Sequence, residues 1–177
     1  MKLAHNEATR CIQLLDQLDR FAVTTFNIFQ PHETIQIADI NRARKKIRDH
    51  WLQEPAFLEK FITKHSEHLS RDDKTLIRSW NTHVTSYFLI VRYDQEHAVF
   101  LSLYDQKVYG VRALTDPFET MIQSAISEIM VETVLLPYNN QIVWDGLVGI
   151  TPLPEAIREQ TQVLTEIYAL EPVITQL

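Results

Sequence analysis

The chain has 177 residues, of which 45% are hydrophobic and 23% are charged, so it can bury a core without a disulfide or a metal. Its one cysteine, Cys11, excludes an intrachain disulfide. The net charge of −6 argues against sequence-independent nucleic-acid binding, which needs a basic surface.

The charge is distributed unevenly along the chain. Residues 1–83 hold 13 Lys and Arg against 11 Asp and Glu, whereas residues 84–177 hold 4 against 12. The first part therefore carries +2 and the second part −8. Because an acidic surface repels nucleic acid, we expect any anionic partner to contact the first part.

The sequence has no segment typical of secretion or membrane insertion. Its first seven residues lack the apolar core of a signal peptide. The longest uninterrupted apolar stretch, at residues 87–91, is far shorter than the ~20 residues that span a bilayer. We therefore expect a cytoplasmic protein that does not associate with membranes.

The first predicted element is a long helix over residues 4–29. Apolar residues from Ala4 to Phe29 recur at spacings of three and four and form one stripe, which ends before Pro31. A stripe of this length suits a helical partner or a second copy of the chain. Packing against the rest of its own chain is the alternative interpretation.

Three further helices are expected in the first part. The second runs from about 33 to 52, and the third is short and covers about 57–62. Ser70 and Asp73 have the spacing of a capping box, which predicts the start of the fourth helix.

After residue 83 the sequence pattern changes from helical to extended. Segments rich in β-branched and aromatic residues alternate with short polar groups, which predicts hairpins. These segments are 84–93, 98–104 and 108–114. We therefore expect a meander of three antiparallel strands.

A helix and two more strands are predicted after the meander. Asp116 is expected as the N-cap of a helix with Pro117 at its first position, running to about residue 129. Strands are then expected over 131–138 and 141–148, joined by a turn at Asn139-Asn140, because Asn tolerates positive φ. A final helix is predicted from residue 154 onward.

These elements predict an α+β fold. About four N-terminal helices precede a five-stranded antiparallel sheet or small barrel, with one helix inserted and another at the C-terminal end. The helical region is expected at 1–83 and the antiparallel β region at 84–177, as one compact unit with a shared core.

Common nucleotide and thiol chemistries have no support in the sequence. The three glycines, at 110, 146 and 149, cannot form a P-loop or a dinucleotide-binding turn. Cys11 lies on the apolar stripe of the first helix, which favours a small core residue over a nucleophile. We expect no cofactor.

His65 and His68 are the best candidates for metal ligands. Their spacing of three can place both on one side of a helix. Residues close in sequence that could complete a site are Glu67, Asp72, Asp73 and His83. The pattern lacks the paired histidines of known zinc helices, and solvated histidines at a helix end are the simpler interpretation. We therefore predict no metal site.

Glu132 and Asp145 are the candidate site carboxylates. Glu132 begins an apolar predicted strand, where it either faces solvent or contributes to a site. Asp145 precedes Gly146, where a turn residue is the simpler interpretation. Catalysis would require a cavity that brings such carboxylates together.

The second predicted helix carries a run of basic residues. With Ala43 and Ile47 on the apolar side, the charges spread around the remaining surface, which favours a solvated helix face. Contact with an anion or a nucleic acid is the alternative. The candidate binding residues are Arg42, Arg44, Lys45, Lys46 and Arg48.

Aromatic residues are frequent in the predicted strands. Some of them could form a stacking surface of the kind that small β-barrels use. The aromatic residues considered are Tyr87, Phe88, Tyr93, Phe100, Tyr104, Tyr109, Tyr138 and Trp144. The acidic charge of this part argues against nucleic acid as the ligand.

Several motifs of the second part give it a resemblance to a known family. They are Ser79-Trp80, Val108-Tyr109-Gly110-Val111, Asp116-Pro117, Leu135-Leu136-Pro137-Tyr138 and Ile142-Val143-Trp144-Asp145-Gly146. Over roughly residues 65–150 the chain resembles an uncharacterised bacterial family of small cytoplasmic proteins. It departs from that family at Tyr138, where phenylalanine is more usual, and at Trp144, where tyrosine is. The family has no assigned activity, so no catalytic role carries over.

The leading functional hypothesis is a non-catalytic binding or interaction protein that self-associates through its N-terminal helix or binds a protein partner. A second hypothesis is a nucleic-acid-associated regulator that uses the basic helix at residues 42–48. The third is a hydrolase that depends on carboxylates or on a metal. No catalytic motif favours the third.

Overall fold

A computed structural model describes residues 2–29, 39–122, 129–147 and 149–177. The chain divides into two compact units. We call Met1–Ala8 together with Thr82–Leu177 the barrel unit, and Thr9–Asn81 the helical unit. The barrel unit is therefore discontinuous in sequence, because the helical unit is inserted after its first residues.

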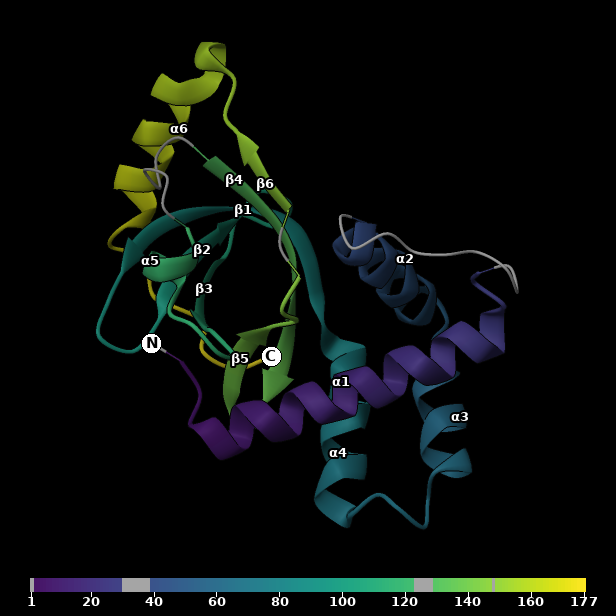
Figure 1. The fold of residues 1–177 in the computed structure, drawn as a ribbon. Helices are drawn as coiled ribbons and strands as arrows, with labels where there is room; N and C mark the ends of the chain where they lie inside the picture. The colour runs from purple at the N-terminus through teal and green to yellow at the C-terminus, as the bar shows by residue number, and fades with distance from the viewer. Residues whose placement is uncertain (1, 30–38, 123–128, 148) are drawn as a thin grey trace. The chain divides into compact units, whose positions relative to one another are not determined.

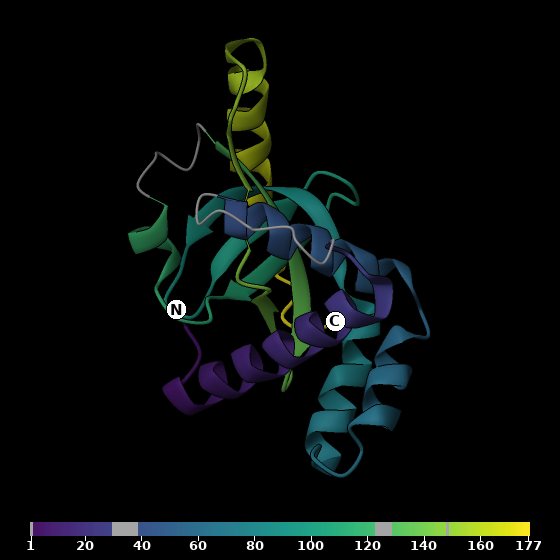
Figure 2. The same cartoon turned by 45° about the vertical axis from the view of Figure 1, so that its right-hand side comes forward.

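The helical unit contains four α-helices, in agreement with the sequence pattern. Their bounds are α1 (His5–Phe26, which begins in the barrel unit), α2 (Ile40–Gln53), α3 (Phe57–Lys64) and α4 (Arg71–Ser79), followed by the short helix η2 (Trp80–Thr82). The residues predicted to begin the second helix, 33–38, lie outside the described residues. α3 and α4 lie side by side (Figure 2).

The start of α4 is the capping box expected from the sequence. The Ser70 hydroxyl accepts a hydrogen bond from the backbone N–H of Asp73, and the Asp73 carboxylate accepts one from the backbone N–H of Ser70. Asp73 also receives the Arg10 guanidinium, with Nε 2.8 Å from Oδ1. This buried carboxylate therefore joins the start of α4 to α1.

Large apolar side chains fill the interior of the helical unit. Phe57 and Phe61 are fully buried and contact the ring of Phe21 at centroid distances of 5.2 and 5.6 Å. The rings of Trp51 and Trp80 lie 6.5 Å apart, and the indole N–H of Trp51 donates to Asp19. No helix in the described ranges is both long enough and apolar enough to span a bilayer.

Six strands lie in the described part of the barrel unit, one more than predicted. Their bounds are β1 (Val84–Tyr93), β2 (Ala98–Ser102), β3 (Val108–Arg112), β4 (Ile129–Tyr138), β5 (Gln141–Trp144) and β6 (Gly149–Pro152). β1 has the predicted bounds. β5 is shorter than predicted, because the chain turns at Gly146, whose φ is +82°.

The strands close into a small barrel, which was one of the two architectures left open by the sequence (Figure 1). The strand order is β1-β2-β3-β5-β4, and β1 pairs again with β4 to complete the ring. All pairs are antiparallel except β3 with β5. β6 extends the sheet by pairing with β4. This is a five-stranded Greek-key barrel of the OB type, with α5 between its third and fourth strands.

Aromatic rings occupy the inside of the barrel. Phe88 on β1 and Phe100 on β2 lie 5.7 Å apart between ring centroids. Phe118 on α5 (Phe118–Met121) lies 5.1 Å from Phe100 and 5.1 Å from Trp144 on β5. Phe118 is fully buried. α5 therefore contributes an aromatic ring to the interior of the barrel.

The predicted N-cap of this inserted helix was wrong by one residue. Pro117, with an extended ψ of 145°, occupies the N-cap position, and Asp116 lies before it. Proline provides no side-chain cap at that position, and α5 is a single turn that ends at Met121. The rest of the predicted helix, residues 123–128, lies outside the described residues.

The outside of the barrel is covered by the C-terminal helix α6 (Glu155–Tyr168) and the segment after it. Leu89, Val99, Leu101 and Val108 form a second apolar cluster on this outer face. Tyr168, Ala169, Val173 and Met130 pack against it. The strand that α6 contacts most is β1.

Segments from both ends of the chain complete the hydrogen bonding of β3. Ile174 donates to the Val108 carbonyl at 2.8 Å and accepts from Gly110 N–H at 2.9 Å. Beyond the other end of β3, Leu3 N–H donates to the Ala113 carbonyl. The position of Gly110 has no room for a side chain, because an added Cβ would lie 2.8 Å from Val173 Cγ1.

Candidate functional site

The outer face of the barrel continues beyond the part that α6 covers. Leu89 and Leu101 are direct partners on β1 and β2 and belong to the covered cluster. Because side chains alternate along a strand, Tyr87 and Leu103 continue the same two rows on the same face. Their backbones are joined by a hydrogen bond of 2.8 Å from Leu103 N–H to the Tyr87 carbonyl.

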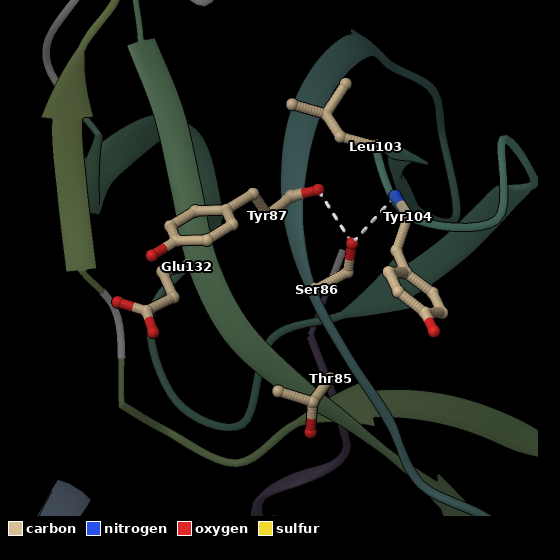
Figure 3. Close-up of a pocket in the computed structure, with 6 residues that line it drawn as sticks. All are labelled: Thr85, Ser86, Tyr87, Leu103, Tyr104 and Glu132. Carbon is tan, nitrogen blue, oxygen red and sulfur yellow. Dashed lines mark hydrogen bonds between the residues drawn. The ribbon is translucent and has the colours of Figure 1, made fainter.

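This uncovered continuation forms a shallow pocket, which we call the tyrosine pocket. Its volume is about 300 Å³, and it is lined by Thr85, Ser86, Tyr87, Leu103, Tyr104 and Glu132. Tyr87 is 48% exposed, Leu103 41% and Tyr104 89%, so the surface is mainly apolar and accessible. Figure 3 shows Tyr87 extending toward Glu132, with Tyr104 on the other side of Ser86.

Two buried serines hold the loop that carries Leu103 and Tyr104. The hydroxyls of Ser86 and Ser102 lie 3.0 Å apart, and both lie 3.3 Å from the Tyr104 backbone nitrogen. The Ser86 hydroxyl also donates to the Tyr87 carbonyl at 2.9 Å (Figure 3). The backbone at Tyr104 is therefore fixed before any ligand arrives, which lowers the entropy cost of binding.

Asp105 fixes the far end of the same loop. Its carboxylate accepts from the Tyr109 hydroxyl at 2.6 Å and from the Lys107 backbone N–H at 3.3 Å. Burial alone would raise the pKa of Asp105, but hydrogen bonds from Tyr109, Ser102 and Lys107 outweigh burial and lower it. Asp105 therefore stays ionised and orders the loop.

Replacing Ser102 by alanine should weaken both the fold and the tyrosine pocket. The change leaves the Tyr104 and Asp105 N–H groups with poorer partners, so we expect a loss of about 1–2 kcal/mol in the free energy of unfolding. Urea denaturation measures this loss, and hydrogen exchange at Tyr104 should become faster. A variant with unchanged stability and unchanged exchange at Tyr104 would show that the serine pair does not hold the loop.

Glu132 lies in the tyrosine pocket, on the outer face of β4. It is the cross-strand partner of Tyr87 on β1 and of Gly149 on β6. A Cβ at Gly149 would lie 3.3 Å from Glu132 Oε2, so the glycine leaves space for the carboxylate. Glu132 is the one charged group among the described residues that line this pocket.

Asp145 has a different environment. Its carboxylate accepts from Leu147 N–H at 3.0 Å and lies 3.2 Å from the Thr133 hydroxyl, in the turn that follows β5. Thr133 and Glu132 are adjacent on β4 and point to opposite faces of the strand. The two candidate carboxylates therefore do not share a pocket, and the contacts of Asp145 are those of a turn residue.

The basic run on α2 is divided among several environments. Arg48 is buried, with its guanidinium 3.0 Å from Asp49. Arg42 pairs with Asp39 at 3.3 Å, and the Lys46 ammonium donates to the Ile28 carbonyl at 3.1 Å. Arg44 is half-buried.

A shallow depression on α2 collects part of the basic run. It is lined by Arg42, Lys45, Lys46, Asp49, His50 and Gln53. Three of the five predicted residues therefore share one surface. That surface also contains a carboxylate, which reduces its attraction for an anion.

The histidine pair lies at the end of α3 in the helical unit. His65 Nδ1 lies 3.0 Å from the Phe61 carbonyl, and the His65 ring packs 4.5 Å from the Phe61 ring. In the described ranges, no group of three His, Cys, Asp or Glu side chains is arranged to hold a metal ion. Both histidines line a different pocket, together with Arg20 and Lys64.

Cys11 is fully buried on α1. Burial raises the pKa of its thiol to about 12, so the reactive thiolate is scarce at neutral pH. Its neighbours on the predicted apolar stripe, Leu15, Leu18 and Ala22, are buried as well.

Sequence reasoning did not single out the tyrosines of the pocket or their supporting residues. Tyr87 and Tyr104 are two of the eight aromatic residues considered for a stacking surface, and the sequence did not distinguish them from the rest. Ser86, Ser102 and Leu103 were missed, because their roles depend on the β1–β2 register, which local sequence does not encode. One pattern in the sequence could have helped: residues two apart on a strand lie on the same face, which places Tyr87 on the face of Leu89.

Comparison with known proteins leaves the function open. No protein-family model, curated protein or solved structure matches the chain. A function must therefore be argued from the site itself, and barrel topology alone does not specify one.

Proposed function

We propose that the chain is a non-catalytic binding protein whose tyrosine pocket receives a lysine or arginine side chain from a basic segment of a protein partner. The observation that carries this proposal is the joint presence of two exposed tyrosines and a carboxylate on a preordered, mainly apolar surface. The partner's side chain would place its hydrocarbon stem against Leu103 and its charge near Glu132.

Aromatic side chains and a carboxylate together favour a cationic ligand. The face of a tyrosine ring carries negative potential and attracts ammonium and guanidinium groups. Glu132 adds a full negative charge beside Tyr87, its cross-strand partner. Exposed tyrosines also contribute contact area at a low cost in conformational entropy, and they are frequent in protein interfaces.

The charge of the surrounding chain supports the same class of partner. Residues 84–177 carry 12 Asp and Glu against 4 Lys and Arg. A field of this sign speeds association with a basic segment and repels nucleic acid from the barrel. α6 and Val173 also cover the outer face of β2 and β3, the face with which OB-type barrels bind oligonucleotides.

The experiment titrates the protein with a synthetic peptide, Gly-Lys-Gly-Arg-Gly-Lys amide, and follows the ring signals of Tyr87 and Tyr104 by NMR. Saturable shifts of both rings are expected for the natural sequence. Replacing Glu132 by glutamine should weaken binding roughly three- to fivefold, because an exposed charge pair contributes at most about 1 kcal/mol.

Glu159→Gln is the matched control, since it removes the same charge from an exposed position on α6. It should leave the affinity unchanged. Equal weakening by both changes, or no saturable shift of either tyrosine, would disprove a specific cation site. A rise in mass with concentration that is abolished by Glu132→Gln would identify a second copy of this chain as the partner.

The other functional hypotheses stay predictions. A nucleic-acid-associated role would use Arg42, Lys45 and Lys46 on the surface of α2. A hydrolase would need a partner for Glu132 other than Asp145. The cytoplasmic location is likewise a prediction.

A further inference from the structure

A second pocket lies within the helical unit, between α1 and α3. Its volume is about 460 Å³, and it is lined by Gln17, Arg20, Phe21, Thr24, Lys64, His65 and His68. Four of these residues come from consecutive turns of α1, and three come from the end of α3 and the residues after it. We call it the cationic pocket.

The side chains of this pocket are hydrogen-bond donors with positive charge. Arg20 and Lys64 are permanent cations, and Gln17 carries a neutral donor. The Thr24 hydroxyl donates to the Phe21 carbonyl at 2.9 Å and lines the pocket with its remaining surface. None of the described residues that line the pocket carries a carboxylate. The nearest acidic partner is Asp16, which lies 2.8 Å from Arg20 and is itself exposed to solvent. A solvated pair of this kind gives way easily to a stronger anion.

The ammonium of Lys64 is held in place by an aromatic ring. Its Nζ lies 5.2 Å from the centroid of the Phe21 ring, within the range of a cation–π contact. Phe21 is in turn packed against Phe57 and Phe61 in the core of the helical unit. This contact favours a position of the Lys64 ammonium beside the pocket.

The ring of His65 is fixed from two directions. A backbone carbonyl only accepts hydrogen bonds, so the 3.0 Å contact with Phe61 O requires the proton on His65 Nδ1. The same ring meets Phe21 edge-on at 5.4 Å. The His65 ring therefore has a defined orientation and lines the pocket together with Arg20 and Lys64.

We propose that the cationic pocket binds a phosphate group, either free or as a monoester, through Arg20 and Lys64, with His68 as a further donor. A tetrahedral dianion matches a concave site with several converging donors and two permanent positive charges. The histidines that suggested a metal site are thereby assigned to an anion site, because permanent cations beside them repel a metal ion. This proposal does not depend on the tyrosine pocket.

The test titrates the full chain with sodium phosphate at pH 7.5, with sodium chloride added to keep the ionic strength constant. The ring signals of His65 and His68 are followed by NMR. We expect saturable shifts at millimolar phosphate. Phenyl phosphate binding as tightly as phosphate or more tightly would identify the monoester as the ligand, and weaker binding would identify free phosphate.

Two variants separate a built site from general surface charge. Lys64→Gln should weaken phosphate binding roughly fivefold or more. Lys60→Gln removes the same charge from the same helix, where Lys60 pairs with Glu54 outside the pocket, and should have no effect. Equal losses in both variants, or histidine signals that shift linearly without saturation, would overturn the proposal. Unchanged far-ultraviolet circular dichroism confirms that each variant is folded.

Discussion

Replacing Phe118 by alanine should destabilise the barrel unit by about 3–5 kcal/mol, the range for a large aromatic side chain removed from a packed core. Phe118 is fully buried, and its ring lies 5.1 Å from both Phe100 and Trp144. α5 is a single turn, so it has little structure of its own with which to close the space left behind. Urea denaturation followed by tryptophan fluorescence measures the loss.

Phe118→Leu is the control for this experiment. Leucine keeps most of the buried volume, so it should cost less than about 1.5 kcal/mol. If the alanine variant were as stable as the leucine variant, the Phe118 side chain would not contribute to the packing of the barrel interior.

Replacing Asp73 by alanine should destabilise the chain by about 2–3 kcal/mol. The change removes the two bonds that the Asp73 carboxylate accepts from Ser70, and it leaves the Arg10 guanidinium without this partner. The estimate lies below the full value for a buried ion pair, because Arg10 is 39% exposed and water screens part of the attraction. Asp72→Ala, at the exposed neighbouring position, should cost much less.

The contribution of Asp73 should depend on pH in a defined direction. Burial raises its pKa, but hydrogen bonds from Arg10 and Ser70 outweigh burial, so the pKa falls below its ordinary value of 3.8. The stability is therefore fully present above the ordinary pKa and is lost as the pH falls through the lowered one.

Denaturation at several pH values tests this dependence. The difference between the natural chain and Asp73→Ala should stay constant from neutral pH to about pH 5 and shrink below about pH 4. A difference that grew on acidification would contradict the lowered pKa.

The sequence predicted best where structure is decided by near neighbours. The capping box at Ser70 and Asp73 depends on residues three apart. The turn at Asn139-Asn140 has the expected positive φ values of 45° and 61°. β1 shows a continuous β-branched and aromatic pattern, which is why its two ends agree with the prediction.

Elements that depend on distant partners could not be predicted in the same way. β6 contains a glycine and a proline and is exposed along its whole length, so it has no hydrophobic alternation to reveal it. The parallel pair of β3 and β5 was also missed, because it is formed only when the barrel closes. The local pattern left an open sheet and a barrel equally acceptable.

The candidate sites show the same division between local and distant information. The sequence identified Glu132 and the histidine pair as unusual, and it included Tyr87 only in a larger set of aromatic residues. It could not show that Glu132 lies opposite Tyr87, or that Lys64 and Arg20 join the histidines. These groupings come from strand register and from the packing of α1 with α3, which are properties of the tertiary fold.

The completion of β3 by both ends of the chain has a consequence for folding kinetics. Leu3 reaches Ala113, and Ile174 reaches Val108 and Gly110, so these contacts join residues that are far apart in sequence. Contacts between residues far apart in sequence form slowly, because closing the large loop between them costs entropy before the contacts can stabilise the chain. We therefore expect these contacts of β3 to form late in folding, and we expect the edge of β3 to be exposed to aggregation until they form.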